Sequence, residues 1–216
     1  MRELAVLTFI TPDGVMQAPA TPEEDTSHGF TLGGWASNYW PEVMEQVERE
    51  AMSQPFDLLF GRKTYDLFAQ HWPNAPESAH GKKLNDATKY VVTSSALAID
   101  WDNSIPITGS VAAEITKLKK RDGPLLQVHG SWQLIQALLD HNLIDEFRLW
   151  TFPVVVGTGK RLFKEGCVPM NLGLKKSAST SNSVVMNIYR RNESLDRRTS
   201  RQFAEQIPNE AGKFSN

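Results

Sequence analysis

The feature that most constrains the fold is an apolar segment that ends at a glycine and continues as a helix. Residues 56–60 are apolar enough to form a buried strand, and Gly61, Arg62, Lys63 and Thr64 follow directly. After Thr64, apolar residues recur at helical spacing. A helix N-terminus carries partial positive charge and unpaired N–H groups, so this turn suits an anion such as a phosphate. An ordinary strand–helix turn with two solvated basic residues is the alternative.

The size and charge of the chain limit the class of protein. Its 216 residues, 40% of them hydrophobic, suit one domain with a substantial core. The formal net charge is only −2, so we expect a small-molecule partner rather than a nucleic acid or a membrane surface. No apolar segment reaches the length of a membrane span, and we therefore expect a cytoplasmic protein. We expect no metal site.

Strands and helices are expected to alternate along the chain, which is typical of an α/β domain. Residues 4–10 form a nearly continuous apolar run that predicts a central strand covered on both faces. Further strands are expected at 89–95, 105–107, 125–129 and 144–152, helices at 41–52, 64–70, 111–118 and after Ser131, a polar connection at 74–86, and a hairpin at 172–180 and 184–190. We expect a mostly parallel sheet with antiparallel C-terminal strands, a domain over residues 1–192, and a polar, mobile tail over 193–216.

A long loop is expected between the first strand and the first helix. It begins near Asp13-Gly14, contains many prolines and glycines, and carries Phe30, Gly34 and Trp35 towards its end. Its aromatic residues favour a segment that folds over a ligand. The alternative is that these rings cover the core.

Four turns are expected at the carboxyl ends of the strands, where ligands gather in open α/β sheets. They are Asp13-Gly14, residues 61–64, residues 93–95 and Gly130-Ser131. Two of them place a glycine at a helix start, where the backbone can approach a pyrophosphate. Residues 93–95 offer hydroxyl groups for a further phosphate.

The order and spacing of these segments resemble the dihydrofolate reductase superfamily. The motifs that carry the resemblance are residues 60–65, 91–95, and 128–131 running into 143–146. Asp13-Gly14 and residues 153–159 are most similar to the branch related to the RibD C-terminal domain, the reductase of bacterial riboflavin biosynthesis. The resemblance covers about residues 3 to 191.

This resemblance implies a three-layer fold, NADPH as cofactor, and a homodimer formed through the terminal hairpin. It implies that the cofactor-binding residues are Gly61, Arg62, Lys63 and Thr64 near the phosphates, Ser94 and Ser95 near the adenosine 2′-phosphate, and Gly130, Ser131 and Trp132 near the pyrophosphate and nicotinamide ribose. The implied activity is hydride transfer from NADPH to a small heterocyclic or carbonyl substrate, such as a pterin or a ribosylaminopyrimidine.

The substrate end is expected near Asp13, as a catalytic residue, with Gly14, Phe30, Gly34 and Trp35 as substrate-binding residues. The resemblance also implies one acidic residue on the helix before residue 56. The choices are Glu42, Glu45 and Glu48, and Glu48 borders the apolar stripe most closely. The alternative is that all three belong to a solvated helix face.

Two other functions stay open at this stage. One is a non-catalytic nucleotide-binding protein, a sensor or resistance factor that keeps the cofactor site without turnover. The other is an α/β domain whose phosphate-binding turns hold a ligand other than a dinucleotide.

Overall fold

The computed structural model describes residues 1–75, 78–94 and 99–192. The strands are β1 (Leu4–Ile10), β2 (Phe56–Gly61), β3 (Lys89–Val92), β4 (Ser104–Ile107), β5 (Leu125–His129), β6 (Glu146–Thr151), β7 (Leu172–Ser179) and β8 (Val185–Arg191). The helices are α1 (Trp40–Ala51), α2 (Arg62–His71), α3 (Ala79–Asp86), α4 (Val111–Lys120) and α5 (Trp132–Asp140), with short 3₁₀ turns at Ser27–Gly29, Ser37–Tyr39 and Trp72–Asn74.

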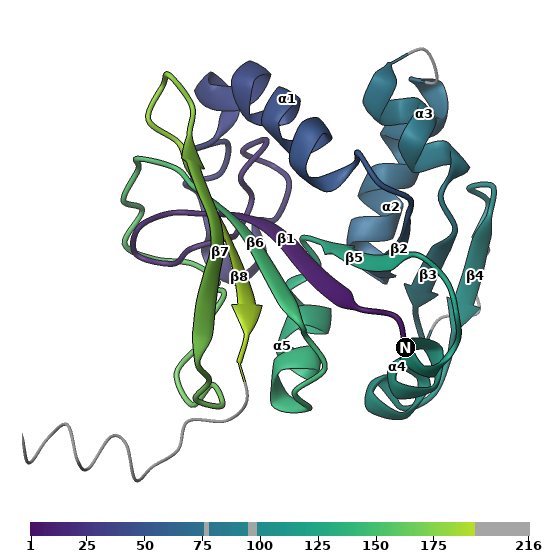
Figure 1. Ribbon diagram of the computed structural model, residues 1–216. Coiled ribbons are helices and arrows are strands. Elements are labelled where there is room, and N and C mark those ends of the chain that lie inside the picture. The colour runs from purple at the N-terminus through teal and green to yellow at the C-terminus, as the bar shows by residue number, and fades with distance from the viewer. Residues whose placement is uncertain (76–77, 95–98, 193–216) are drawn as a thin grey trace, which may run out of the picture.

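The strands form one eight-stranded sheet in the order β4-β3-β2-β5-β1-β6-β8-β7 (Figure 1). The strands from β4 to β6 run parallel to one another. The β7–β8 hairpin is antiparallel and joins the sheet beside β6. These pairings confirm the mostly parallel sheet with antiparallel C-terminal strands, and they place β1 inside the sheet, as its continuous apolar run predicts.

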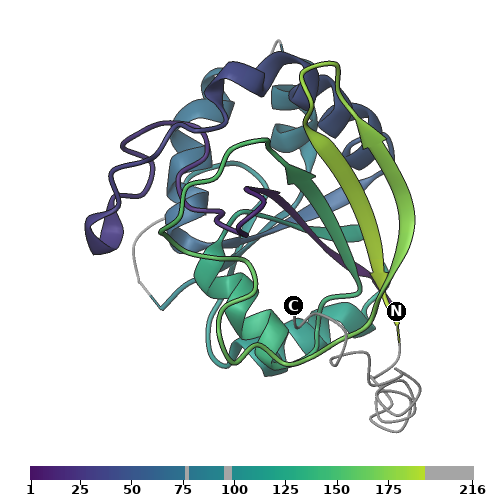
Figure 2. The ribbon, with the colours of Figure 1, turned by 90° about the vertical axis from the view of Figure 1, so that its left-hand side faces the viewer.

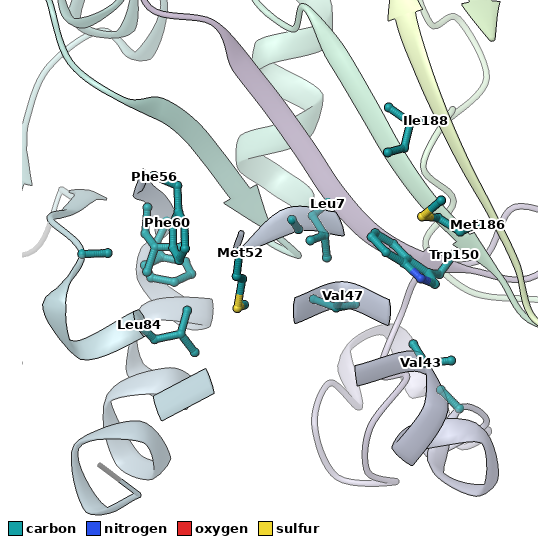
Figure 3. Packing of buried hydrophobic residues seen from close by; sticks show 14 of the residues in the cluster. Leu7, Val43, Val47, Met52, Phe56, Phe60, Leu84, Trp150, Met186 and Ile188 are labelled. Atoms are coloured by element: carbon teal, nitrogen blue, oxygen red, sulfur yellow. The ribbon is translucent and has the colours of Figure 1, made fainter. Parts of the chain in front are cut away.

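Helices cover both faces of the sheet and give the expected three layers. In Figure 1, α1, α2 and α3 lie on one face, and α4 and α5 on the other. On the first face, Val43 and Val47 of α1 pack in one buried cluster with Leu7, Phe60 and Trp150 of the sheet (Figure 3). On the second face, α4 and α5 contribute Ile115, Leu118, Leu134 and Ile135 to a separate cluster.

Two expectations about the segments around α2 and α3 are wrong. The helix after β2 begins at Arg62 rather than at Thr64. A helix, α3, also occupies most of the expected polar connection 74–86. This helix buries only Gly81 and Leu84, so it has no apolar stripe to reveal it, and it starts where the Ser78 hydroxyl accepts a hydrogen bond from Gly81 N–H.

The long loop between β1 and α1 is present. In the view of Figure 2 it is the dark purple and blue trace at the left, and the β7–β8 hairpin is at the right. Phe30 and Trp35 are only 4% and 9% exposed, and Trp35 Nε1 donates to Gln17 O at 2.8 Å. These rings belong to the buried interior of the domain, as the alternative interpretation of the loop has it. The expected tail, 193–216, lies outside the described residues.

Lys89 at the start of β3 is fully buried and holds three chain segments together. Its ammonium donates to the carbonyls of Asn85, Ala87 and Asp102 at 2.7–2.9 Å. Its Nζ also lies 4.4 Å from the centroid of the Trp101 ring. Burial lowers the pKa of Lys89 to about 8, which still leaves the side chain protonated at neutral pH.

Candidate functional site

Two glycine turns meet at the carboxyl ends of the adjacent strands β2 and β5. Gly61 ends β2, and Gly130 and Ser131 connect β5 to α5. The Gly61 N–H donates to Ser131 Oγ at 3.0 Å, which joins the turns directly. Gly130 and Ser131 both have φ values near +60°, and a Cβ placed on Gly130 would lie 3.7 Å from Thr64 Cγ2. The sequence predicted both turns, and the structure brings them together.

The helices that start at these turns provide donors for an anion. Among the described residues, neither α2 nor α5 has a side-chain cap, and neither has an acidic residue in its first turn. Arg62 and Lys63 instead occupy the first turn of α2, where the helix dipole disfavours cations. A bound phosphate would remove this unfavourable arrangement and use the first-turn N–H groups.

Arg62 and the end of β3 extend the site away from the two turns. Arg62 lies with Tyr65 and Asp66 along a groove of about 870 Å³ between α2 and residues 100–103, and its Nε donates to Asp66 at 2.8 Å. Gly61 pairs with Val92, the last residue of the neighbouring strand β3. The exposed Ser94 comes two residues after Val92 and therefore follows the strand beside the Gly61 turn. Ser95 lies outside the described residues.

Asp13 joins the end of β1 to the glycine-rich segment that follows β6. Its carboxylate accepts hydrogen bonds from Thr11 Oγ1 (2.6 Å), Gly157 N–H (2.8 Å) and Val156 N–H (3.3 Å). The hydrogen bond from Thr11 is the main reason why the pKa of Asp13 lies below its usual value. Asp13 is therefore ionised at neutral pH and already has donors around it.

Arg161 completes this connection, and the sequence reasoning missed it. Its Nε donates to Asp13 O at 2.9 Å, and its Nη2 donates to Gly157 O at 3.2 Å. Its own carbonyl accepts from Trp132 Nε1 at 2.8 Å. The first residue of α5 is thereby tied to the turn after β1. These contacts span up to 148 residues, so no local pattern could have shown them.

The expected substrate-binding residues fall into two groups. Gly14 and Gly34 have positive φ values of +80° and +79°, which glycine adopts readily. The rings of Phe30 and Trp35 are packed in buried clusters. They therefore support the loop after β1 from its buried side.

None of the three acidic candidates on α1, Glu42, Glu45 and Glu48, is buried. Glu48 is bonded to Lys83 of α3 at 2.9 Å, and this hydrogen bond is the first reason why its pKa is lowered. Glu42 accepts from Ser181, and Glu45 is exposed. The polar residue that α1 buries is Gln46, whose Oε1 accepts from Trp150 Nε1 at 2.8 Å. Its position three residues after Val43 places it on the apolar face, a signal that a search limited to carboxylates overlooks.

The structure offers no grouping of three or more His, Cys, Asp or Glu side chains that suits a metal ion within residues 1–75, 78–94 and 99–192. In the same part of the chain, no helix is both long and apolar enough to cross a bilayer.

The sheet order, the three layers and the paired glycine turns define a dihydrofolate-reductase-like α/β protein. The family model of the RibD C-terminal domain matches residues 2–186. The chain therefore belongs to the RibD C-terminal domain family, which confirms the resemblance found in the sequence.

Two relatives in Bacillus subtilis (strain 168) have no assigned activity. The chain is 33% identical over 142 residues to the uncharacterized protein YyaP, covering 64% of this chain and 75% of YyaP. It is 27% identical over 133 residues to the uncharacterized protein YwjB, covering 62% of this chain and 72% of YwjB.

Solved structures share the fold at low sequence identity. A Shewanella sp. PV-4 protein, whose name assigns it provisionally to riboflavin biosynthesis, has a TM-score of 0.58 and 20% identity, with 88% of this chain and 99% of that chain covered. A pyrimidine reductase-like protein of Corynebacterium diphtheriae gives 0.52 and 11%, with 89% and 93% covered. Dihydrofolate reductase of Enterococcus faecalis, solved with NADP(H), gives 0.53 and 13%, with 88% and 97% covered.

Proposed function

We propose that this protein is an NADPH-dependent reductase that transfers a hydride to a small heterocyclic or carbonyl substrate of the pterin or pyrimidine class. The observation that carries the proposal is the junction of Gly61 with Ser131, where two uncapped helix N-termini meet beside Lys63. Membership of the RibD C-terminal domain family supports the same activity. In this role the protein works in the cytoplasm.

The residues at the junction fit the cofactor. When bound, NADPH supplies the hydride. The first-turn N–H groups of α2, with Arg62, Lys63 and Thr64, would hold its phosphates, and Ser94 and Ser95 would lie near the 2′-phosphate. Gly130 has no side chain between the two turns, so the backbone there can approach a pyrophosphate. Ser131 and Trp132 would border the nicotinamide ribose.

The substrate would lie at the neighbouring end of β1. Asp13 and Glu48, the expected catalytic carboxylates, both have environments that favour the charged form. An ionised carboxylate orients a partner or balances positive charge more readily than it donates a proton. We therefore assign Asp13 the task of positioning the glycine-rich segment beside the substrate, and Gly14, Gly34, Phe30 and Trp35 the shaping of that region.

Binding of the cofactor can be measured without knowing the substrate. NADPH at about 100 times its Kd should stabilise the folded protein by roughly 2.7 kcal/mol, and it should quench tryptophan fluorescence by energy transfer. Lys63→Gln should weaken NADPH binding about tenfold, because one charge–phosphate contact is lost. Lys120→Gln, at an exposed lysine that ends α4, is the matched control. Absence of both the stabilisation and the energy transfer would refute the cofactor assignment.

Turnover separates the reductase from a non-catalytic nucleotide-binding protein. Stopped-flow absorbance would follow NADPH oxidation with pterins, ribosylaminopyrimidines and quinones. NADPH binding without oxidation by any of them would favour a sensor or resistance factor. A parallel titration with NADH measures the contribution of the 2′-phosphate contacts.

The proposed assembly is a homodimer formed through the β7–β8 hairpin. Strand β7 is the outer strand of the sheet and carries Leu174, which is 57% exposed. Within residues 1–75, 78–94 and 99–192 no further strand pairs with the outer edge of β7, and an edge of this kind can pair with a second copy. Sedimentation analysis of the wild type against Leu174→Lys tests this assembly.

A further inference from the structure

The inference concerns Arg161, whose contacts join three parts of the proposed site but which the proposed chemistry leaves without a task. Its guanidinium reaches carbonyl oxygens on two separate turns: Nε donates to Asp13 O at 2.9 Å, and Nη2 donates to Gly157 O at 3.2 Å. The same Nη2 lies 3.8 Å from Oδ2 of the Asp13 carboxylate. Because the guanidinium is planar and rigid, Arg161 fixes the spacing of the turn after β1 and the turn after β6.

Gly157 is held from both sides by this arrangement. Its N–H donates to the Asp13 carboxylate at 2.8 Å, and its carbonyl accepts from Arg161. The Arg161 side chain is 45% exposed, so its charge attraction to Asp13 is weakened by solvent. The contribution of Arg161 is therefore mainly geometric: two directed hydrogen bonds from one rigid group.

Backbone contacts align the same two segments. Val15 and Arg161 form an isolated antiparallel β-bridge. The N–H of Leu162 donates to Gly14 O at 3.0 Å, and the N–H of Met16 donates to Lys160 O at 2.8 Å. A pairing this short is marginally stable by itself, so we expect the side-chain contacts of Arg161 to decide how often it opens.

Helix α5 holds the segment from its other side. Trp132 Nε1 donates to Arg161 O at 2.8 Å, and Gln136 Nε2 donates to Leu162 O at 3.0 Å. Trp132 and Gln136 are four residues apart and therefore lie on one face of α5. Since α5 begins directly after Ser131, the proposed cofactor turn is continuous with the helix that supports Arg161.

We propose that Arg161 is a positioning residue that couples the cofactor end of the site to the substrate end. NADPH bound at the start of α5 orders, through Trp132 and Arg161, the turn that carries Asp13. This inference rests on the proposed function for the place of the cofactor, and it adds how the two ends of the site depend on each other. Coupling of this kind is reciprocal, so an ordered turn also favours NADPH binding.

Amide hydrogen exchange measured by NMR tests the positioning role in the free protein. The reporters are the N–H groups of Gly157 and Leu162, and the N–H of Val6 in the interior strand β1 reports global unfolding. Arg161→Gln should speed exchange of both reporters at least about tenfold and leave Val6 unchanged. Arg161→Lys keeps the charge without the rigid fork, so its effect should be intermediate. Unchanged reporters in Arg161→Gln would overturn the proposal.

Saturating NADPH tests the coupling. It should slow exchange of Gly157 and Leu162 about tenfold in the wild type, and it should not affect Thr180 in the β7–β8 turn, whose N–H donates to Val184 O. Trp132→Phe keeps an aromatic ring but loses the donor to Arg161 O, so at saturation the NADPH effect should fall below about threefold. Arg121→Gln, at an exposed arginine, is the control and should behave as the wild type.

A purely structural role for Arg161 would give a different result. The Arg161 and Trp132 variants would then exchange faster without ligand and still show the full NADPH effect, which would refute the coupling. NADPH binding is measured separately, by the stabilisation of the wild type. Binding with no change at Gly157 and Leu162 refutes this inference alone, whereas absence of binding refutes the proposed function and the coupling with it.

Discussion

The hydrogen bond between Gly61 and Ser131 makes a quantitative prediction about how the two glycine turns are joined. Ser131 has φ = 60° and ψ = 55°, a left-handed conformation that costs a non-glycine residue about 1–2 kcal/mol. Its hydroxyl accepts the N–H of Gly61 at a point beyond the β2–β5 pairing, which ends at Leu58. The bond contributes about 1 kcal/mol and is opposed by the backbone cost.

Two substitutions separate these effects. Ser131→Ala removes the hydrogen bond but keeps the strained backbone, so the free energy of unfolding should fall by about 1 kcal/mol. Ser131→Gly removes both, so its stability should lie within about 0.5 kcal/mol of the wild type and above that of Ser131→Ala. For a domain of this size, 1 kcal/mol corresponds to a Tm change of about 2–4 °C.

Urea unfolding followed by tryptophan fluorescence measures these differences, and equal m-values would show that the unfolded state is unchanged. Ser110→Ala is a matched control, because Ser110 precedes α4 without a side-chain cap and has φ = −70°. It should change stability by less than about 0.5 kcal/mol. A Ser131→Ala variant as stable as the wild type, or a Ser131→Gly variant less stable than Ser131→Ala, would refute the reasoning.

Lys89→Met should lower the free energy of unfolding by about 3 kcal/mol or more, because the buried carbonyls of Asn85, Ala87 and Asp102 lose their common donor; a loss below 1 kcal/mol in urea unfolding would contradict this. His129 has a pKa of about 3 in the folded protein, against 6.5 ordinarily, so between these values the unfolded chain binds a proton that the folded protein does not. Stability should therefore fall as the pH drops below about 6.5, by roughly 2 kcal/mol at pH 5, and a His129→Gln variant should lose this part of the slope.

The fold was predictable where one strong local pattern decided it. The continuous apolar run of β1 indicated an interior strand, and β1 does lie between β5 and β6 in the sheet. Helix α3 lacked such a pattern, because its buried residues are only Gly81 and Leu84. Its N-terminus is capped by the side chain of Ser78.

The candidate site was predictable as a set of turns but not as a set of contacts. Gly61 and Ser131 are 70 residues apart, and Asp13 and Arg161 are 148 apart. The residue types at these positions are suited to binding an anion or to forming a tight turn. Only the sheet order brings β2 beside β5, and the segment after β6 beside the end of β1. Gln46 and His129 were overlooked because a neutral amide and a buried imidazole carry no charge pattern that local sequence can reveal.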